Sequence, residues 1–254
     1  MGFGLPTSVK KTLRRLMRAA GYDVVRAVES PAVTLLGLPH LPVRTVIDVG
    51  ANTGQCARKA LWAFPAARIV SFEPLPEPFE ALRGWAAGTG GRVSAVNAAL
   101  GDADGTVEFL VHCDHAASSS ALPTTTLCET LYPFTRNQRL ATVAQETLDG
   151  AVRRLGLSLE PDLVVKLDVQ GCEDRVIRGG METLGVARAC ICEVSLRPLY
   201  RGQATFATIH DLLGGLGLRY AGNLDQRHDE AGRAVSVDAL FLREGADPAR
   251  EPRP

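Results

Sequence analysis

The sequence lacks four features that would each have pointed to a particular class of protein. Lys and Arg together number 28, as do Asp and Glu, so a net charge of zero gives no reason to expect nucleic acid as a partner. No apolar run reaches the ~18 residues of a membrane span, and charged residues interrupt the N-terminus where a signal peptide needs an apolar core. The six cysteines lack the regular spacing of a disulfide scaffold. These absences predict a reduced, cytoplasmic protein.

The length and composition predict one large soluble α/β domain. The chain has 254 residues, of which 46% are hydrophobic and 22% are charged, and this is typical of a globular protein with a single large core. We expect an N-terminal amphipathic helix and its connection over 1–43, the main domain over 44–244, and a disordered tail over 245–254.

The N-terminal segment 8–20 has the pattern of an amphipathic helix. Val9, Leu13, Leu16 and Met17 share one side, and basic residues occupy the rest. Because the apolar stripe is narrow, we expect a cap packed on the domain with a solvated basic face. A helix lying on a membrane surface, and hence a peripheral membrane contact, is the alternative.

After Arg44, strand-like and helix-like segments alternate, which is typical of a doubly wound, mostly parallel sheet with helices on both faces. Strands are expected at 45–49, 68–72, 92–96, 105–112, 142–145, 162–168 and 188–194, with a closing antiparallel pair near 217–222 and 235–242. Helices are expected at 54–63, 77–87, 147–156, 173–184 and 205–216, and a polar loop is expected from about 113 to 140.

The most informative segment joins the first of these strands to the first helix. An apolar strand that contains Asp48 runs into a turn with Gly50 and Gly54, and glycines there let the backbone approach a ligand closely. Glu73 ends the next strand, where a carboxylate can accept hydrogen bonds from two ribose hydroxyls. The combination predicts a nucleoside-binding site, although a tight turn, a helix cap and a surface carboxylate are the plain structural alternatives.

Polar residues also follow the other strands of the sheet. Asn97 and Ala98 follow the third strand, Asp168 ends a later one, and Glu193 closes the next. Ligands of open α/β sheets bind beyond the carboxyl ends of the strands, so these residues should lie on one edge. The residues expected to bind the cofactor are Asp48, Gly50, Asn52, Gly54, Glu73, Asn97 and Ala98.

The spacing of the glycines argues against a nicotinamide dinucleotide. That cofactor needs G-x-G-x-x-G, in which the third glycine permits close helix–strand packing, whereas this chain has Gly50-x-x-x-Gly54 directly after Asp48. A carboxylate there would repel a pyrophosphate and attract the ammonium of a methionine moiety. The pattern therefore favours S-adenosylmethionine, which has a ribose, a sulfonium and no phosphate.

Several ordered blocks of the sequence resemble the FkbM-family methyltransferases over roughly residues 43–243. The main blocks are IDVGANTGQ (47–55), SFEPLPEPFEAL (71–82), NAALGDADGTVEF (97–109), VVKLDVQGCEDRVIRGG (164–180), CEVSLRPLYRGQATF (192–206) and VDALFLRE (237–244). The resemblance implies a class I, Rossmann-like methyltransferase fold that uses S-adenosylmethionine. It also implies O-methylation of a hydroxyl on a sugar, a glycolipid or a polyketide-type product. N-methylation and a non-catalytic nucleoside-binding relative are the alternatives.

Methyl transfer to an alcohol needs alignment of the oxygen and a group that takes its proton. Asp168 is the first candidate base, followed by Glu193 and Glu173, although Asp168 is as well placed to bind the methionine amino group. Gln170 stands where the family often has Glu, and an amide cannot act as a base. Lys166 shares a strand face with Asp168, which predicts an ion pair.

The remaining expectations concern the acceptor and metals. Contacts to the acceptor are expected from the loop 113–140 and from Tyr200 to Gln203, with Tyr200 either stacking on a sugar or packing in the core. Arg197 and Arg201 are more simply solvated surface residues than ligands for an anion. His112 and His115 lack a second ligand pair at a recognisable spacing, so no metal is expected.

Overall fold

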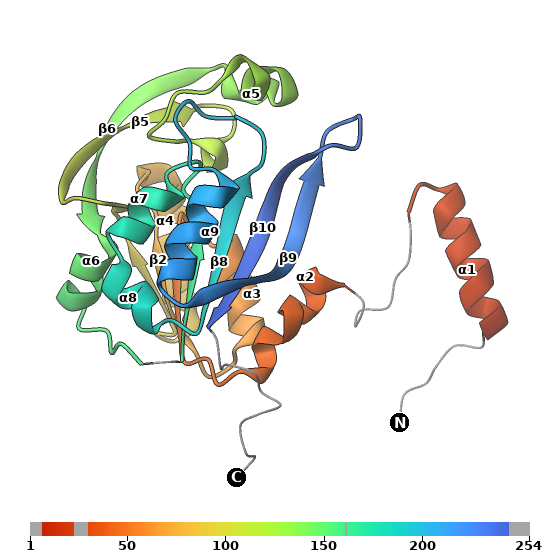
Figure 1. Ribbon diagram of the computed structural model, residues 1–254, viewed down its shortest axis with the longest axis horizontal. Coiled ribbons are helices and arrows are strands. Elements are labelled where there is room, and N and C mark those ends of the chain that lie inside the picture. Colours follow the sequence, from red (N-terminus) through yellow and green to blue (C-terminus); the bar gives the residue numbers. More distant parts are fainter. Residues whose placement is uncertain (1–6, 23–29, 161, 244–254) are drawn as a thin grey trace, which may run out of the picture.

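The computed structural model describes residues 7–22, 30–160 and 162–243 (Figure 1). Its core is a seven-stranded sheet with the order β3-β2-β1-β7-β8-β10-β9. The first five strands in that order are parallel, and β10 is antiparallel to both of its neighbours. The strands are β1 (Thr45–Val49), β2 (Arg68–Phe72), β3 (Val93–Val96), β7 (Leu163–Leu167), β8 (Ala189–Ser195), β9 (Leu218–His228) and β10 (Ala234–Arg243).

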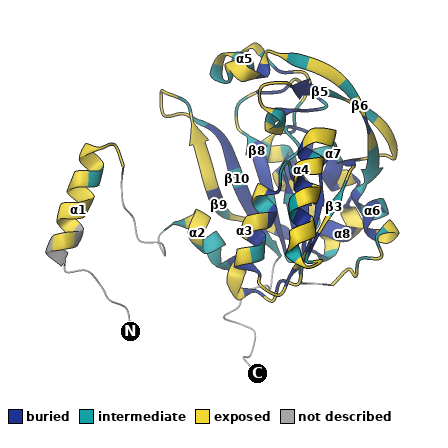
Figure 2. Ribbon diagram, turned by 180° about the vertical axis from the view of Figure 1, so that it is seen from behind, coloured by how far each residue is buried: buried dark blue, intermediate teal, exposed yellow. Residues whose placement is uncertain are grey.

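Helices cover both faces of this sheet, because successive strand residues point to opposite sides. Val46 and Val164 face one side, where they pack against α3 (Gln55–Ala63) and α4 (Pro76–Ala86). Ile47 and Val165 face the other side, and the dark, buried strands lie between the two helical layers in Figure 2. That second layer consists of α6 (Leu148–Arg154), α7 (Glu173–Arg178), α8 (Met181–Val186) and α9 (Phe206–Gly215). The predicted doubly wound fold is confirmed.

A second sheet of three strands lies beyond the carboxyl end of β8 (Figure 1). Its order is β4 (Ala99–Gly101), β6 (Gln138–Thr147) and β5 (Gly105–His112). The sequence predicts a short strand at 142–145, whereas β6 has 10 residues and begins inside the expected polar loop. That loop also contains a helix, α5 (Thr126–Leu131). Pairing with β5 makes the polar start of β6 a strand, in which Arg139 is exposed and the Gln138 amide donates to the hydroxyl of Thr124.

The helix expected at 173–184 is two helices, α7 and α8, which meet at Gly179 and Gly180. A Cβ atom at Gly179 would lie 1.9 Å from the carbonyl oxygen of Gly101, and one at Gly180 would lie 2.5 Å from Leu148 Cδ2. Asp149 then caps α8, since its Oδ1 accepts hydrogen bonds from the backbone N–H and the hydroxyl of Thr183 at 2.8 and 2.6 Å. Close backbone packing across the sheet end therefore breaks a helix that the local sequence favours.

The N-terminal helix α1 (Thr7–Ala19) does not pack as the expected cap. Val9, Leu13 and Leu16 are 46%, 43% and 65% exposed, and Figure 1 shows α1 standing away from the domain. The segment η2 (Leu35–His40), which follows α2 (Pro31–Thr34), instead supplies Leu38 to the buried cluster on the α3 side. No helix among the described residues is long and apolar enough to cross a membrane. The expected tail at 245–254 lies outside the described residues.

The contact between α7 and β4 gives a stability prediction. We expect Gly179→Ala to destabilise the fold by about 2 kcal/mol or more, because the added methyl group meets a backbone oxygen that cannot rotate away. Gly185→Ala is the matched control, since nothing lies within 4 Å of its Cβ position in α8 and alanine favours a helix by ~0.5–1 kcal/mol. Urea denaturation measures both. Equal stability of the two variants would contradict the packing described here.

Candidate active site

The loop after β1 is held against the end of β7 by a contact that only glycine permits. Gly50 has φ of 75°, and a Cβ atom on it would lie 1.9 Å from the carbonyl oxygen of Asp168. The N–H groups of Gly50 and Ala51 both donate to the carbonyl of Phe72, at 3.0 and 2.9 Å, which ties the same loop to the end of β2. Three neighbouring strand ends are thereby brought together.

Glu73 lies where β2 ends and is only 5% exposed. Its Oε2 accepts from the N–H of Asn52 at 2.8 Å, and its Oε1 accepts from the N–H of Leu75 at 2.9 Å. Burial raises the pKa of Glu73 to about 7, against the opposing effect of these two hydrogen bonds. Each oxygen keeps a further lone pair, so the carboxylate can also accept hydrogen bonds from two hydroxyls of a ligand.

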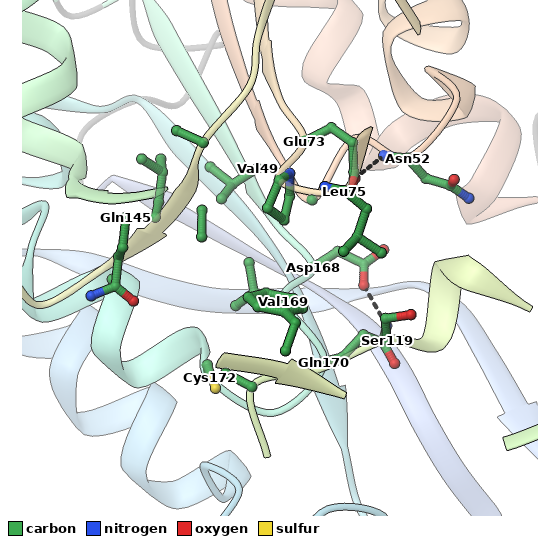
Figure 3. Close-up of a pocket in the computed structure, with 18 of the residues that line it drawn as sticks. Val49, Asn52, Glu73, Leu75, Ser119, Gln145, Asp168, Val169, Gln170 and Cys172 are labelled. Carbon is green, nitrogen blue, oxygen red and sulfur yellow. Dashed lines mark hydrogen bonds between the residues drawn. The ribbon is translucent and has the colours of Figure 1, made fainter. Parts of the chain in front are cut away.

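Glu73 lines a first cavity between the two sheets (Figure 3). Gly50, Asn52, Ala98 and Asp168 also line it, together with apolar side chains from β4, β5 and the segment 116–121. Three of the other residues expected to bind a cofactor do not line it. Asp48 is completely buried, Gly54 packs against Leu82 and Trp85, and the Asn97 amide donates to the carbonyls of Glu73 and Pro74.

A largely buried lysine pairs with the acidic groups next to this cavity. Lys166 Nζ lies 2.8 Å from Asp168 Oδ2 and 3.9 Å from Asp48 Oδ1, which confirms the predicted ion pair. Burial alone would lower the pKa of Lys166, but the two carboxylates outweigh it and raise that pKa above its ordinary value. Burial likewise raises the pKa of Asp168, yet the Lys166 ammonium and the surrounding hydrogen bonds bring it below the ordinary range. Asp168 is therefore ionised at neutral pH.

Gln170 connects Asp168 to a second carboxylate. Its Nε2 donates to Asp168 Oδ1 and to Glu193 Oε2, each at 2.6 Å, and Glu193 Oε1 also pairs with Arg227. Gln170 has φ of 56°, and its backbone carbonyl accepts from Ser120 Oγ at 2.7 Å. Burial and then the charge of Asp168 raise the pKa of Glu193 well above its ordinary value. An amide is suited to this position because it donates to both carboxylates without adding a third charge.

Asp168 and Gln170 also line a second cavity that adjoins the first. Glu193 and Arg227 form its charged side, and three neighbouring rings lie along its rim. The His115 and Phe134 centroids are 4.7 Å apart, and those of Tyr132 and Phe134 are 5.7 Å apart. The two cavities therefore share a wall formed by Asp168 and Gln170, and Glu193 lines the second cavity alone.

Glu173, the third candidate base, has a different role in the structure. Its Oε1 accepts from the N–H of Val169 at 3.0 Å, and its Oε2 accepts from the N–H of Gly171 at 3.1 Å. The side chain is buried and lines neither cavity. Burial raises the pKa of Glu173 to about 7, against the effect of its backbone hydrogen bonds. Glu173 fixes the loop that presents Gln170.

In the segment 197–203, the side chains of Tyr200, Gln203 and Arg197 bond to neighbouring groups of the protein. Tyr200 is 2% exposed, and its hydroxyl lies 2.7 Å from the carbonyl of Ser118 and 2.8 Å from Gln170 Oε1, which favours core packing over stacking on a ligand. The Gln203 amide stabilises the turn, because its oxygen accepts from the N–H of Leu199 and its nitrogen donates to the carbonyl of Arg197. The Arg197 side chain pairs with Asp229. Arg227 was not singled out from the sequence, because β9 extends past the expected strand end at 222.

The histidines at the end of β5 and just after it form hydrogen bonds with serine. His112 Nδ1 lies 2.8 Å from Ser118 Oγ, and His115 Nδ1 lies 3.3 Å from the same oxygen. Within residues 7–22, 30–160 and 162–243, no group of three or more His, Cys, Asp or Glu side chains is arranged to hold a metal ion.

The strand order, the helices on both faces and the site at the carboxyl ends of β1, β2, β7 and β8 define a class I methyltransferase fold. Residues 48–223 match the methyltransferase FkbM domain. The chain is 31% identical over 188 residues to the 2-O-methyltransferase NoeI of Sinorhizobium fredii, covering 70% of this chain and 74% of that protein. The chain therefore belongs to the FkbM methyltransferase family.

A solved structure shows the same fold at low sequence identity. It is the methyltransferase FkbM of Methylobacillus flagellatus, with a TM-score of 0.50 and 12% identity, over 81% of this chain. The matched region spans 47% of that chain, which is considerably longer.

The buried position of Glu173 predicts a pH-dependent effect on stability. The pKa of Glu173 is about 7 in the folded protein, above the ordinary value of 4.5 that it has in the unfolded chain. Its protonated form therefore stabilises the fold. This contribution is fully present below pH 4.5 and is lost as the pH rises through 7. Relative to the wild type, we expect Glu173→Gln to gain up to ~3 kcal/mol of unfolding free energy between pH 5 and pH 8. Urea denaturation at several pH values measures this. The exposed Glu77→Gln serves as control. The prediction is wrong if, for both variants, the difference in unfolding free energy from the wild type does not change with pH.

Proposed function

We propose that this protein transfers the methyl group of S-adenosylmethionine to a hydroxyl of a sugar. The observation that carries the proposal is the pair of cavities that meet at Asp168 and Gln170. One contains a buried carboxylate suited to a ribose, and the other contains a second carboxylate and an aromatic rim. The 2-O-methyltransferase activity in the name of the Sinorhizobium relative supports oxygen as the acceptor atom.

The residues of the first cavity fit the cofactor. Glu73 would accept hydrogen bonds from the two ribose hydroxyls, and the apolar wall at Leu75 and Ala98 would contact the adenine. Asp168, rather than the inaccessible Asp48, would face the methionine ammonium. Gly50 keeps the loop backbone close enough to Asp168 for both walls to touch one ligand. When bound, S-adenosylmethionine supplies an electrophilic methyl group on its sulfonium.

The second cavity provides a place and a base for the acceptor. A hydroxyl that enters beside Gln170 would meet the carboxylates of Asp168 and Glu193, which hold its oxygen in line with the methyl group. The hydroxyl proton must leave as the new C–O bond forms, because the sulfonium becomes a neutral thioether. Glu193 is the better proton acceptor of the two, since a raised pKa makes a carboxylate more basic, whereas the Lys166 ion pair makes Asp168 weakly basic.

The rim of the second cavity favours a ring-shaped acceptor with hydroxyls. His115, Tyr132 and Phe134 present half-exposed aromatic surface that can lie against the C–H face of a sugar. Arg227 and the Glu193 carboxylate line the same cavity, where they can hydrogen-bond to ring hydroxyls. N-methylation would use the same base. The proposal of oxygen as the acceptor atom therefore rests on the Sinorhizobium relative and on this aromatic rim.

The cofactor assignment predicts a specific loss of affinity. Wild-type protein should bind S-adenosylhomocysteine and not NAD, and Glu73→Gln should weaken that binding 10- to 100-fold, because a charge-assisted hydrogen bond is worth ~1.5–3 kcal/mol. Calorimetric titration measures both ligands, with the exposed Glu77→Gln as a matched control. Binding of NAD alone, or equal affinity of the two variants, would overturn the assigned cavity. Binding without turnover of any acceptor would identify a non-catalytic relative.

The assignment of the base predicts a particular pH profile. Release of S-adenosylhomocysteine is followed with a panel of methyl glycosides, and kcat/KM is measured against pH for the acceptor that is turned over best. With Glu193 as base, kcat/KM should fall on the acid side at a pKa well above 4.5. Glu193→Gln should lower kcat at least ~100-fold and leave S-adenosylhomocysteine affinity within about twofold, since Glu193 does not line the first cavity.

The same experiment separates Glu193 from Asp168. If Asp168 is the base, wild-type activity stays constant down to the low pH at which that residue protonates. Asp168→Asn would then remove activity while Glu193→Gln retains most of it.

A further inference from the structure

The helix α1 presents an apolar stripe that is not covered by the part of the chain that the structure describes. Val9, Leu13 and Leu16 recur at helical spacing, and each is more than two-fifths exposed. Two faces of the large sheet could have received this stripe, but each is already packed by its own helices. On the α3 side, η2 fills the place next to α3 with Leu38, which is fully buried.

The charge of the same helix indicates what covers the stripe. The 13 residues Thr7–Ala19 contain five Lys or Arg and no Asp or Glu, although the chain as a whole has zero net charge. The positive charge is therefore concentrated on a segment that stands apart from the domain (Figure 1). A surface that pairs with α1 has to be both apolar and anionic, and a bilayer with anionic headgroups combines the two.

We propose that α1 binds the surface of an anionic membrane, with its apolar stripe in the headgroup region and its basic residues against the lipid phosphates. The helix is 13 residues long, too short to span the bilayer, so it would lie in the plane of the interface. This interaction does not depend on the transfer reaction.

Vesicle flotation of the full chain tests the proposal. Vesicles of phosphatidylcholine alone are compared with vesicles that contain about one-third phosphatidylglycerol. We expect binding only to the anionic vesicles and at least a tenfold loss of binding in 0.5 M NaCl, because the charge interaction is screened. Binding to both vesicle types alike, or to neither, would overturn the proposal.

Three double variants locate the contact. Vesicle affinity should fall at least tenfold in Lys11→Glu with Arg15→Glu, since each basic residue near an anionic surface contributes roughly fivefold to it. An equal loss is expected in Leu13→Gln with Leu16→Gln, which removes apolar surface from the stripe. Glutamine keeps the helix propensity of leucine, so the second pair tests the apolar stripe alone. Arg136→Glu with Arg139→Glu changes the same charge on the domain, at exposed positions, and should leave binding unchanged.

The melting temperature identifies variants that have lost the fold, and none is expected to shift because α1 stands outside the core. Equal loss in the domain variant would place the contact elsewhere. Loss in the charge variant without any loss in the leucine variant would show that the vesicles are bound through charge alone, without the apolar stripe. Either result would overturn the proposal.

Discussion

The ion pairing of the largely buried Lys166 ammonium is the interaction on which the site depends. In the register of β1 and β7 this residue lies opposite Asp48, and its own strand carries it next to Asp168. Burial of two carboxylates at adjacent strand ends would cost several kcal/mol per charge without a cation between them. With Lys166 in place, Asp168 stays ionised at the point where both cavities meet. The lysine thus makes it possible for an acidic cluster to face a cationic ligand from inside the protein.

Gln170 divides this cluster into two parts. Its amide donates to both Asp168 and Glu193. Hydrogen bonds with the side chains of Glu173 and Ser120 hold the loop that carries it. The two carboxylates then differ in basicity, because one pairs with a buried lysine and the other with the partly exposed Arg227. A site that needs one carboxylate to hold a cation and another to accept a proton is served by this difference.

Much of the fold could be predicted, because in the parallel strands apolar runs such as 163–167 are bounded by turns and alternate with helical segments. Features that rest on contacts between distant segments could not. The break at Gly179 follows from its contact with Gly101, and the length of β6 follows from its pairing with β5. The packing of α1 was predicted wrongly, since its pattern shows an apolar stripe but not whether the domain has a free surface to receive it.

The sequence by itself determined which chemistry was available, namely glycines after the first strand, carboxylates at the strand ends and a lysine two residues before Asp168. It also determined the fold family through the order of these blocks. The tertiary structure alone decided which of these residues share a cavity. In it Asp48 is buried, Glu173 accepts hydrogen bonds from the loop after β7, and Arg227 of β9 pairs with Glu193. The physical reason is that side-chain type is local, whereas burial and pairing depend on strand register and on which chain segments cover each sheet edge.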